Sequence, residues 1–451
     1  ENIVTFFGRL GSWLAIPLIS IIIFDIITRR FFVLGSTKLQ EMEWHFHTSL
    51  FLLVLGYAYL KDAHVRIEIV REKYSLKVKA ILETLGIINM NFWKNKKVFI
   101  TGHTGFKGTW LILFLEKLGA KICGYSLDPD PSPNLYRDIF GISKRSIIDL
   151  RGNILNKIEL KKKIKEFQPE IVFHLAAQPL VRESYKNPSL TWETNLIGTL
   201  NLLESLKDLD DKCSVIIITT DKVYKNKEWF YGYRENDELG GIDPYSASKA
   251  CTEILVNSWR KSFCGKGTFQ KDNLKVVTAR AGNVIGGGDW AKDRIIPDFI
   301  KSVKNNNPIR IRNPNSKRPW QHVLEPLGGY LMLAKNIHEE SKNYTYETAY
   351  NFGPNISSNK TVLELVKEIN KIWKCDYIKN ENLSDFHESK NLSLCIEKAY
   401  SELNWYPIWD FKQTIEKTIN WYKDVSEGSD PYKRCLSDLE SYLNLVKNKF
   451  S

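Results

Sequence analysis

From residue 90 onward, the chain alternates short apolar runs with longer segments in which apolar residues return every three or four positions. The short runs are rich in β-branched and aromatic residues and predict strands, whereas the longer segments predict amphipathic helices. The predicted strands are Lys97–Thr101, Lys121–Tyr125, Ser146–Asp149, Ile171–His174, Ser214–Thr219 and Lys275–Arg280. The predicted helices are Thr109–Leu118, Lys157–Phe167, Leu190–Lys207 and Ser246–Phe263. This alternation favours an α/β fold with a doubly wound parallel sheet.

The pattern becomes less regular after about residue 289. It predicts a smaller lobe, closed by helices near Thr361–Trp373 and Phe411–Val425. We therefore expect three parts, over residues 1–89, 90–288 and 289–451. They are a hydrophobic helical segment, a domain built on the sheet, and a lobe that mainly binds substrate.

Residues 1–89 have a different character from the rest of the chain. The stretch Gly11–Phe24 is uncharged, and its apolar character resumes past Asp25 as far as Arg29. A second apolar run covers Thr48–Leu60. A membrane-spanning helix needs about 20 mostly apolar residues, so the first run qualifies only marginally and the second is short. The pattern predicts an α-helical segment of membrane type.

Two motifs in this segment suggest where it comes from. The runs LQEMEWH at residues 39–45 and DAHVRIEI at residues 62–69 resemble the small membrane subunit of tripartite (TRAP) solute transporters. One interpretation is a genuine anchor that brings the chain to the inner membrane. The other is a gene fusion or fragment without transport activity, because a truncated small subunit lacks its large partner. Met90 resembles a natural start and favours the second interpretation.

Composition limits the classes of partner. The chain has 451 residues, with 64 Lys and Arg against 52 Asp and Glu, which gives a net charge of +12. Such a charge is compatible with nucleic-acid binding. However, the basic residues are dispersed and no zinc-finger or RNA-binding motif is present, so we expect a solvated basic surface and no nucleic acid. The seven widely spaced cysteines include no C-x-x-C, which favours reduced thiols in a cytoplasmic domain without a metal site.

The first chemical motif is a glycine-rich turn between the first predicted strand and its helix. Gly102, Gly105 and Gly108 have the G-x-x-G-x-x-G spacing. The first allows a tight turn, the second lets the backbone approach a pyrophosphate, and the third lets the helix pack closely on the sheet. The N–H groups at the helix N-terminus then face the phosphates. The motif therefore predicts a dinucleotide site.

Two acidic positions extend this prediction. Asp128 follows the turn by about 20 residues, as an acid that binds an adenosine ribose does, although a plain turn beside Pro129 explains it equally well. Asp149 and Leu150 follow the third strand, where they either flank an adenine or cap the strand end.

The second motif is Tyr245-Ser-Ala-Ser-Lys249. Residues four apart share one face of a helix, so the Lys249 ammonium is expected to lower the pKa of the Tyr245 phenol. The phenolate can then accept a proton from a sugar hydroxyl while hydride leaves for a nicotinamide.

With HLAAQ at residues 174–178, these motifs identify the chain from Met90 almost to its end as a member of the extended short-chain dehydrogenase/reductase family. The resemblance implies a Rossmann-type sheet, bound NAD and a nucleotide-sugar substrate. The cofactor-binding residues that it implies are Gly102, Thr104, Gly105, Phe106, Lys107, Gly108, Asp128, Asp149, Leu150, Leu175, Ala176, Ala177, Tyr245 and Lys249.

Within that family, the segment Thr219–Tyr224 (TTDKVY) separates epimerases from 4,6-dehydratases. By resemblance, Thr220 hydrogen-bonds the C4 oxygen of the sugar and Asp221 protonates the departing C6 hydroxyl. Most relatives then carry glutamate as the base at C5, whereas this chain has Lys222. A desolvated lysine can act as that base, but an ion-pair role fits equally well.

Further runs narrow the resemblance to dehydratases that act on CDP-glucose. They are GHTGFKGTWL, Arg280–Asp298 and Arg318–Leu331. The resemblance implies a lyase with recycled NAD, a role in deoxysugar synthesis for surface polysaccharide, and a homodimer built on helices near 190–207 and 246–263. The implied substrate-binding residues are Gln178, Asn283, Arg294, Arg312, Arg318 and His322. Two alternatives remain: another nucleotide-sugar dehydratase or epimerase, and a membrane transport subunit with a nucleotide-binding tail.

Overall fold

The computed structural model describes residues 90–141, 147–339, 349–379 and 390–450, together with Leu18, Ile22, Trp44, His45 and Thr48. The chain divides into two compact units, Glu1–Lys79 and Ala80–Ser451. The membrane-type segment and the transporter-like motifs predicted over residues 1–89 thus lie almost wholly outside the described residues. Within the residues that are described, no helix is both long enough and apolar enough to cross a bilayer.

The second unit is organised around a seven-stranded sheet in the order β11-β6-β5-β4-β1-β2-β3. All of its strand pairs are parallel. The strands are β1 (Lys97–Thr101), β2 (Lys121–Ser126), β3 (Ile148–Arg151), β4 (Ile171–His174), β5 (Cys213–Ile218), β6 (Leu274–Ala281) and β11 (Ala349–Phe352). The strand order reverses between β1 and β4, which is where doubly wound sheets bind their ligands. The predicted Rossmann-type sheet is confirmed.

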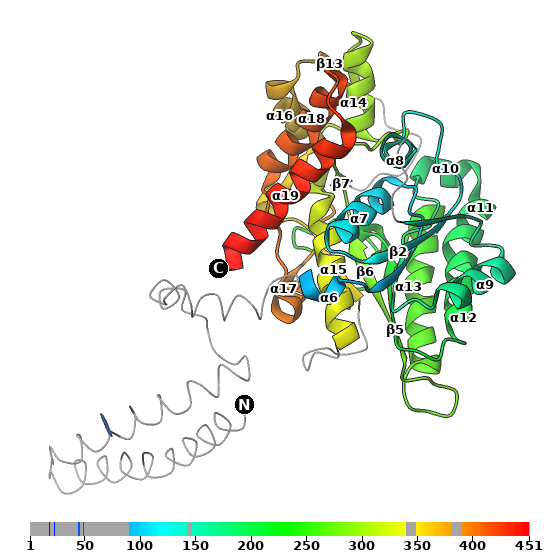
Figure 1. Cartoon of the computed structure of the whole chain (residues 1–451). Coiled ribbons are helices and arrows are strands. Elements are labelled where there is room, and N and C mark those ends of the chain that lie inside the picture. The colour runs from blue at the N-terminus through cyan, green and yellow to red at the C-terminus, as the bar shows by residue number, and fades with distance from the viewer. Residues whose placement is uncertain are drawn as a thin grey trace, which may run out of the picture. The chain divides into compact units, whose positions relative to one another are not determined.

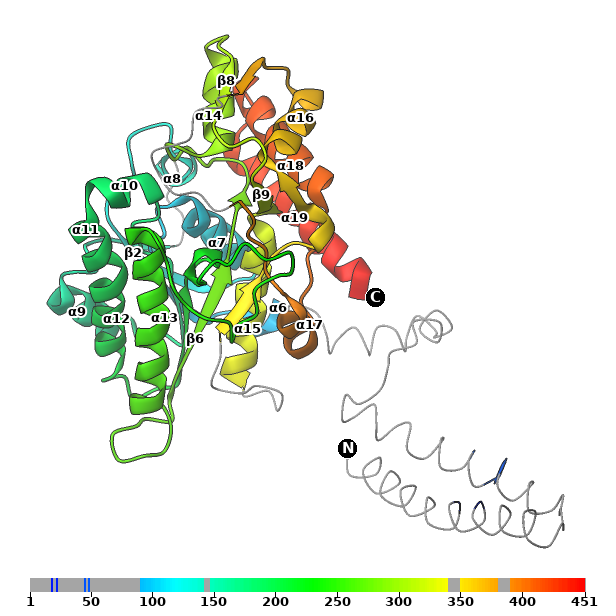
Figure 2. The same ribbon diagram turned by 180° about the vertical axis from the view of Figure 1, so that it is seen from behind.

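Helices cover both faces of this sheet (Figures 1 and 2). One face carries α9 (Lys157–Phe167), α12 (Gly198–Leu206) and α13 (Pro244–Phe263), and the other carries α7 (Phe106–Lys117) and α15 (Leu324–Glu339). Neighbouring residues of one strand enter opposite cores: Val215 and Ile217 pack toward α9, α12 and α13, whereas Ile216 packs toward α7 and α15. Burial on both faces explains why the strands are continuous apolar runs in the sequence.

The shorter helices that precede β5 in the chain are α6 (Met90–Trp93), α8 (Leu135–Phe140), α10 (Val181–Lys186) and α11 (Pro188–Trp192). A π-helical turn, η1 (Glu193–Ile197), joins α11 to α12. The predicted helix Leu190–Lys207 is therefore interrupted. A 3₁₀ turn, η2 (Asp221–Val223), follows β5.

The C-terminal lobe contains α14 (Ile295–Lys304), α16 (Val362–Ile372), α17 (Glu397–Leu403), α18 (Phe411–Ser426), α19 (Pro431–Phe450) and the 3₁₀ turn η3 (Ile356–Ser358). Three small sheets pair β7 (Val284–Ile285) with β10 (Gln321–His322), β8 (Ile309–Ile311) with β13 (Tyr377–Lys379), and β9 (Lys317–Pro319) with β12 (Asn359–Thr361). Figure 1 shows α14, α16 and α18 gathered at one end of the unit.

One feature of the sheet was not predicted. β11 comes from the region assigned to the substrate lobe, yet it pairs with β6 and completes the sheet. Its four residues are too few for a periodicity argument, and pairing with a strand about 70 residues earlier is a tertiary property. The chain accordingly crosses the predicted division at residue 288, and the division into two parts there stays a prediction.

Candidate active site

The glycine-rich turn lies at the carboxyl end of β1, at the point where the strand order reverses. Gly102 has φ +73°, and a Cβ added there would lie 2.6 Å from the backbone nitrogen of Ala176. A Cβ at Gly108 would overlap the carbonyl oxygen of Gly102. Only glycine therefore fits these two positions, as the spacing predicted.

The start of α7 offers donors to an anion. Its N-cap is Gly105, and no side chain caps the first turn. The hydroxyl of Thr104 is engaged elsewhere, with the Ser126 hydroxyl at 2.7 Å and the Leu127 carbonyl at 3.2 Å, so it fixes the turn to the end of β2. Uncapped N–H groups behind a close-packed glycine turn fit a dinucleotide diphosphate.

The loop after β4 closes the other side of this turn. The backbone nitrogen of Leu175 donates to the Thr101 carbonyl at 3.1 Å, and that of Ala176 donates to the Thr101 hydroxyl at 3.3 Å. Leu175, Ala176 and Ala177 are half-buried. The predicted cofactor residues of β1 and β4 are therefore neighbours.

At β3, the predicted adenine-flanking acid is already engaged within the protein. The Asp149 carboxylate contacts His103 Nε2, the Tyr136 hydroxyl and the Arg151 guanidinium, each at 2.8 Å. Arg151 also pairs with the predicted ribose acid Asp128 at 3.3 Å. Asp128 remains 83% exposed, so its other oxygen is accessible, whereas Leu150 is half-buried. Neither Tyr136 nor Arg151 belongs to one of the sequence motifs.

The acid of the TTDK segment is buried at the end of β5. Asp221 Oδ1 accepts from the Thr220 hydroxyl at 2.9 Å and pairs with Lys222 Nζ at 3.4 Å. Asp221 Oδ2 is buried without a hydrogen-bond partner among the described residues. A side chain at Gly282 would overlap this carboxylate. An unpartnered buried carboxyl oxygen is costly in a purely structural role and is typical of a functional group.

Tyr245 lies beside this acid because α13 begins there. Asp243 caps the helix in a capping box with Ser246, which fixes the first turn that carries Tyr245. Burial raises the pKa of Tyr245 to about 12, although a hydrogen bond with Thr220 opposes that rise. The net shift is thus opposite to the predicted lowering, and Lys249 is not among the main causes that act on this phenol. The Lys249 ammonium instead donates to the Ile218 carbonyl at 3.2 Å.

Cationic groups gather around these residues. Burial lowers the pKa of Lys107 to about 8, and the charges of Arg294, Lys249 and Lys222 act in the same direction. The charge of Asp221 acts in the opposite direction on Lys107. Arg294, which pairs with Asp289 at 2.8 Å, also acts on Tyr245. The structure thus brings Lys107 and Arg294 to the residues predicted to be catalytic, where their charges favour anionic ligands.

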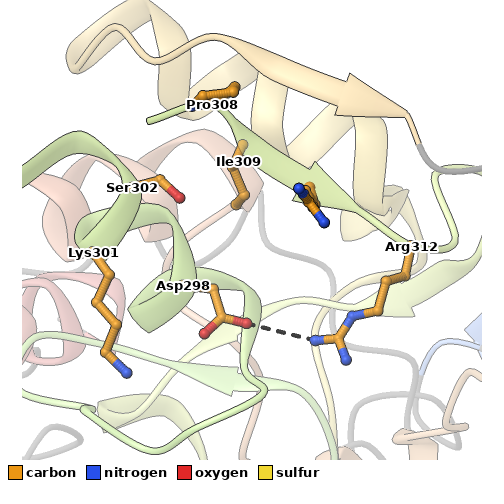
Figure 3. Close-up of a pocket in the computed structure, with 7 residues that line it drawn as sticks. Asp298, Lys301, Ser302, Pro308, Ile309 and Arg312 are labelled. Atoms are coloured by element: carbon orange, nitrogen blue, oxygen red, sulfur yellow. Dashed lines mark ion pairs between the residues drawn. The ribbon is translucent and has the colours of Figure 1, made fainter. Parts of the chain in front are cut away.

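Two more predicted substrate residues, Asn283 and Arg312, have different surroundings. Asn283 has φ +38° and directly follows Gly282, and its Oδ1 is buried without a partner among the described residues. Arg312 pairs with Asp293 at 3.3 Å and with Asp298 at 3.5 Å. Arg312 and Asp298 line a pocket of about 450 Å³ between α14 and β8, where their ion pair is visible in Figure 3.

Two other residues predicted to bind substrate, Gln178 and His322, have side chains that contact other parts of the protein. Gln178 accepts from the Leu180 nitrogen at 2.6 Å and donates to the Thr191 hydroxyl at 2.8 Å, so it organises its own loop. His322 is fully buried, and its ring lies edge-on to those of Trp110 and Trp409. Burial lowers its pKa to about 3, and its Nε2 is buried without a hydrogen-bond partner among the described residues.

Arg318 lies half-buried on β9, where its guanidinium donates to the Lys317 carbonyl at 2.8 Å. Phe106 is half-buried at the start of α7, close to Gly286. Both positions are compatible with their predicted roles.

Sequence reasoning missed a buried amide that joins several of these parts. Asn195, in the π-helical turn η1, accepts from the Gln178 nitrogen at 2.8 Å and donates to the Ser248 hydroxyl at 2.9 Å. It connects the loop after β4 to the helix that carries Tyr245. A π-turn leaves no periodicity signal, although such turns are frequent at functional sites.

The chain is similar to known nucleotide-sugar dehydratases and epimerases. A family model described as GDP-mannose 4,6 dehydratase matches residues 99–418. The chain is 44% identical over 365 residues to the CDP-glucose 4,6-dehydratase of Salmonella typhimurium, covering 79% of this chain and 99% of that protein. It is 25% identical over 359 residues to the CDP-paratose 2-epimerase of Salmonella typhi, covering 73% and 100% respectively. Its fold resembles that of the dTDP-glucose 4,6-dehydratase of Bacillus anthracis solved with NAD, with a TM-score of 0.59, 21% identity, and 75% and 99% coverage.

Proposed function

The chain belongs to the GDP-mannose 4,6 dehydratase family, and from this membership and the site geometry we propose that it converts CDP-glucose to CDP-4-keto-6-deoxyglucose. The observation that carries the proposal is Asp221, a buried acid with one unpartnered oxygen, next to Thr220 and Tyr245. An epimerase has no leaving hydroxyl to protonate, whereas a dehydratase needs such an acid. The 44% identity to a CDP-glucose 4,6-dehydratase favours the cytidine nucleotide.

We propose NAD as the resident cofactor. The glycine turn, the uncapped start of α7 and the adjoining loop of Leu175–Ala177 fit a dinucleotide, and Asp128 offers an oxygen to its ribose. When bound, NAD accepts a hydride from C4 of the sugar and returns it to C6, so the reaction has no net redox change.

The chain's own residues move the protons. Tyr245 takes the proton of the C4 hydroxyl as that carbon becomes a ketone, and Thr220 holds the C4 oxygen. The ketone acidifies C5, whose proton passes to a base, for which Lys222 is the candidate. Asp221 gives a proton to the C6 hydroxyl, which leaves as water. The proton taken from C5 then returns to C5, and the proton taken by Tyr245 replaces the one that Asp221 gave, so the sum is loss of one water.

The placement of Tyr245 supports these roles. Its phenol hydrogen-bonds with Thr220, and the charge of Arg294 favours the phenolate, which is the form that accepts a proton. Lys249, whose ammonium lies at the end of β5, is proposed to bind the nicotinamide ribose.

Arginines of the C-terminal lobe are proposed to bind the sugar nucleotide. Arg294, Arg312 and Arg318 carry the forked donors that match phosphate oxygens, and Asn283 lies next to the catalytic acid. Gln178 and His322 are not part of this proposal, because their side chains are used inside the protein.

We also propose a homodimer and a cytoplasmic catalytic unit that supplies deoxysugars for surface polysaccharide. Leu190, Ile197 and Ile254 are 48%, 44% and 57% exposed on α11, η1 and α13, which supports an interface there. Membrane contact through residues 1–89, and the alternative of a fusion or fragment, stay predictions.

The direct test is to incubate the full-length protein with CDP-, UDP-, dTDP- and GDP-glucose and to identify the products. We expect a 4-keto-6-deoxy sugar, formed fastest from the CDP substrate. Conversion of another nucleotide sugar in its place would correct the specificity. Epimerised sugar without loss of water would overturn the dehydratase proposal itself.

A further inference from the structure

A buried carboxylate lies directly behind the proposed catalytic residues. Glu253 is on α13, one helical turn after Lys249, and both side chains are only 4% exposed. Its oxygens accept from Thr219 at 2.5 Å and from Thr278 at 2.7 Å, and they pair with Arg280 at 2.9 Å. The sequence motifs single out neither Glu253 nor Arg280, and the reaction steps above do not use this ion pair.

Glu253 and Lys249 together hold the end of β5. Lys249 donates to the carbonyl of Ile218, and Glu253 accepts from the hydroxyl of the next residue, Thr219. The residues that follow directly are Thr220 and Asp221. One face of α13 therefore fixes the backbone of the segment that carries Thr220 and Asp221. Thr220 hydrogen-bonds with Tyr245, and Asp221 is the proposed acid.

Arg280 holds the other end of the same segment. Its guanidinium donates to the Tyr224 hydroxyl at 2.8 Å, and that hydroxyl donates to Asn351 Oδ1 at 2.7 Å. Tyr224 comes two residues after Lys222. The pair of Glu253 and Arg280 thus anchors the TTDK segment on both sides, from α13 to β6 and β11.

The charge of Glu253 also acts on Lys249. Burial lowers the pKa of Lys249 to about 8, and Glu253 opposes that fall. Two other titratable groups from neighbouring elements face Lys249: Lys107 of α7, and His174 of β4, whose own pKa is lowered to about 3 so that it is neutral. Without Glu253, the cationic form of Lys249 would lose its favourable neighbour.

We propose that Glu253 is a positioning residue for the dehydration: paired with Arg280, it aligns the Thr219–Tyr224 segment on α13 and places a negative charge one helical turn from Lys249. The inference rests on the proposed function, since it assigns Lys249 and Thr220 their roles. A buried ion pair is by itself weak support for stability, because desolvation offsets the attraction between its charges. The ion pair of Glu253 and Arg280 has a role in the reaction because it lies one helical turn from Lys249 and holds the segment that carries Thr220 and Asp221.

The test compares kcat and KM against pH for the wild-type protein and Glu253→Gln with CDP-glucose. Glutamine keeps the shape and removes the charge, so the Lys249 pKa falls. Because Lys249 must be cationic, the decline of kcat at high pH should begin about one pH unit lower. At pH values above the displaced decline, kcat of Glu253→Gln should be about tenfold lower than that of the wild-type protein, while KM stays within about twofold.

The matched control is Glu325→Gln. Glu325 is also fully buried, and its carboxylate accepts from the backbone nitrogens of Ile408 and Trp409 in the C-terminal lobe. This variant should lower the melting temperature without moving the pH profile. Glu253→Asp should restore the high-pH limb, because it returns the negative charge.

If Glu253→Gln does not fold because Arg280 is left unpaired, the double variant Glu253→Gln with Arg280→Gln removes both charges and should show the same displaced limb. An unchanged profile in either folded variant would overturn the positioning role. Absence of product from the wild-type protein would instead refute the proposed function, so the two failures are distinguishable.

Discussion

At the scale of single residues, the chemistry depends on which side chains are buried together. Asp221, Thr220 and Tyr245 meet at the end of β5, and burial shifts the Tyr245 pKa upward. The Y-x-x-x-K spacing predicted the helix face correctly but not the direction of this shift, since desolvation depends on the surrounding lobes. Three substitutions separate the roles of these side chains.

Tyr245→Phe removes the hydroxyl that accepts the C4 proton, together with its hydrogen bond with Thr220. We expect kcat to fall by about 10²- to 10⁴-fold, the usual contribution of a general base, with little change in melting temperature. Product formation from CDP-glucose measures the effect. Tyr231→Phe is the control, because Tyr231 is 60% exposed outside the catalytic set and should leave turnover unchanged. Normal turnover by Tyr245→Phe would rule out its role.

Asp221→Asn keeps the shape of the buried side chain but removes the acid. The C6 hydroxyl then lacks its proton donor, so elimination should slow more than the first hydride transfer. Rapid-mixing absorbance should show reduced cofactor accumulating before product appears. If both steps slow equally, Asp221 does not protonate C6.

Lys222→Arg distinguishes a base at C5 from an ion-pair partner of Asp221. Arginine keeps the positive charge but does not lose its proton, so it cannot serve as a base. We expect the variant to oxidise C4 and to lose exchange of the C5 hydrogen with deuterated water. Retained exchange would assign Lys222 to the ion pair alone.

At the scale of elements, the cofactor site depends on how closely β1, α7 and the loop after β4 approach one another. Gly102 is at the centre of this approach, because both its positive φ and its contact with Ala176 require glycine. The motif predicted this element fully, since the requirement is local to the turn and its spacing.

Gly102→Ala should weaken NAD binding by at least tenfold, because the new methyl group collides with the backbone at Ala176 and displaces the turn. Gly428→Ala is the matched control. Gly428 also has positive φ, +101°, but nothing lies within 4 Å of an added Cβ, so this variant bears only the backbone cost. Calorimetric titration with NAD, alongside melting temperatures, compares them. Equal NAD affinity in the two variants would contradict this explanation.

At the scale of the whole molecule, the unit Ala80–Ser451 contains all the residues proposed for catalysis and binding. β11 ties the C-terminal lobe to the sheet, and α15 packs beneath it. The short helix α6 also belongs to this body, because Trp93 is fully buried and its ring stacks near Phe173. Trp93 is therefore part of the core that supports the sheet.

A chain that begins at Met90 should fold and retain wild-type turnover, whereas one that begins at Lys96 should not. Loss of Trp93 from the core costs about 3–5 kcal/mol, a large part of the stability of a typical domain. Expression, melting temperature and product formation compare the two. An inactive or insoluble chain from Met90 would show that earlier residues belong to the fold.

The sequence by itself determined the parts whose requirements are local. These are the sheet strands from Lys97 to Ala281, the glycine turn, and the Tyr245–Lys249 and Thr220–Lys222 sets, because periodicity and short spacing specify them. Only the tertiary structure decided that His322 is a core residue, that Gln178 is used in its own loop, and that Glu253 pairs with Arg280. Burial and partners at these positions depend on elements distant in the chain, which no short pattern specifies.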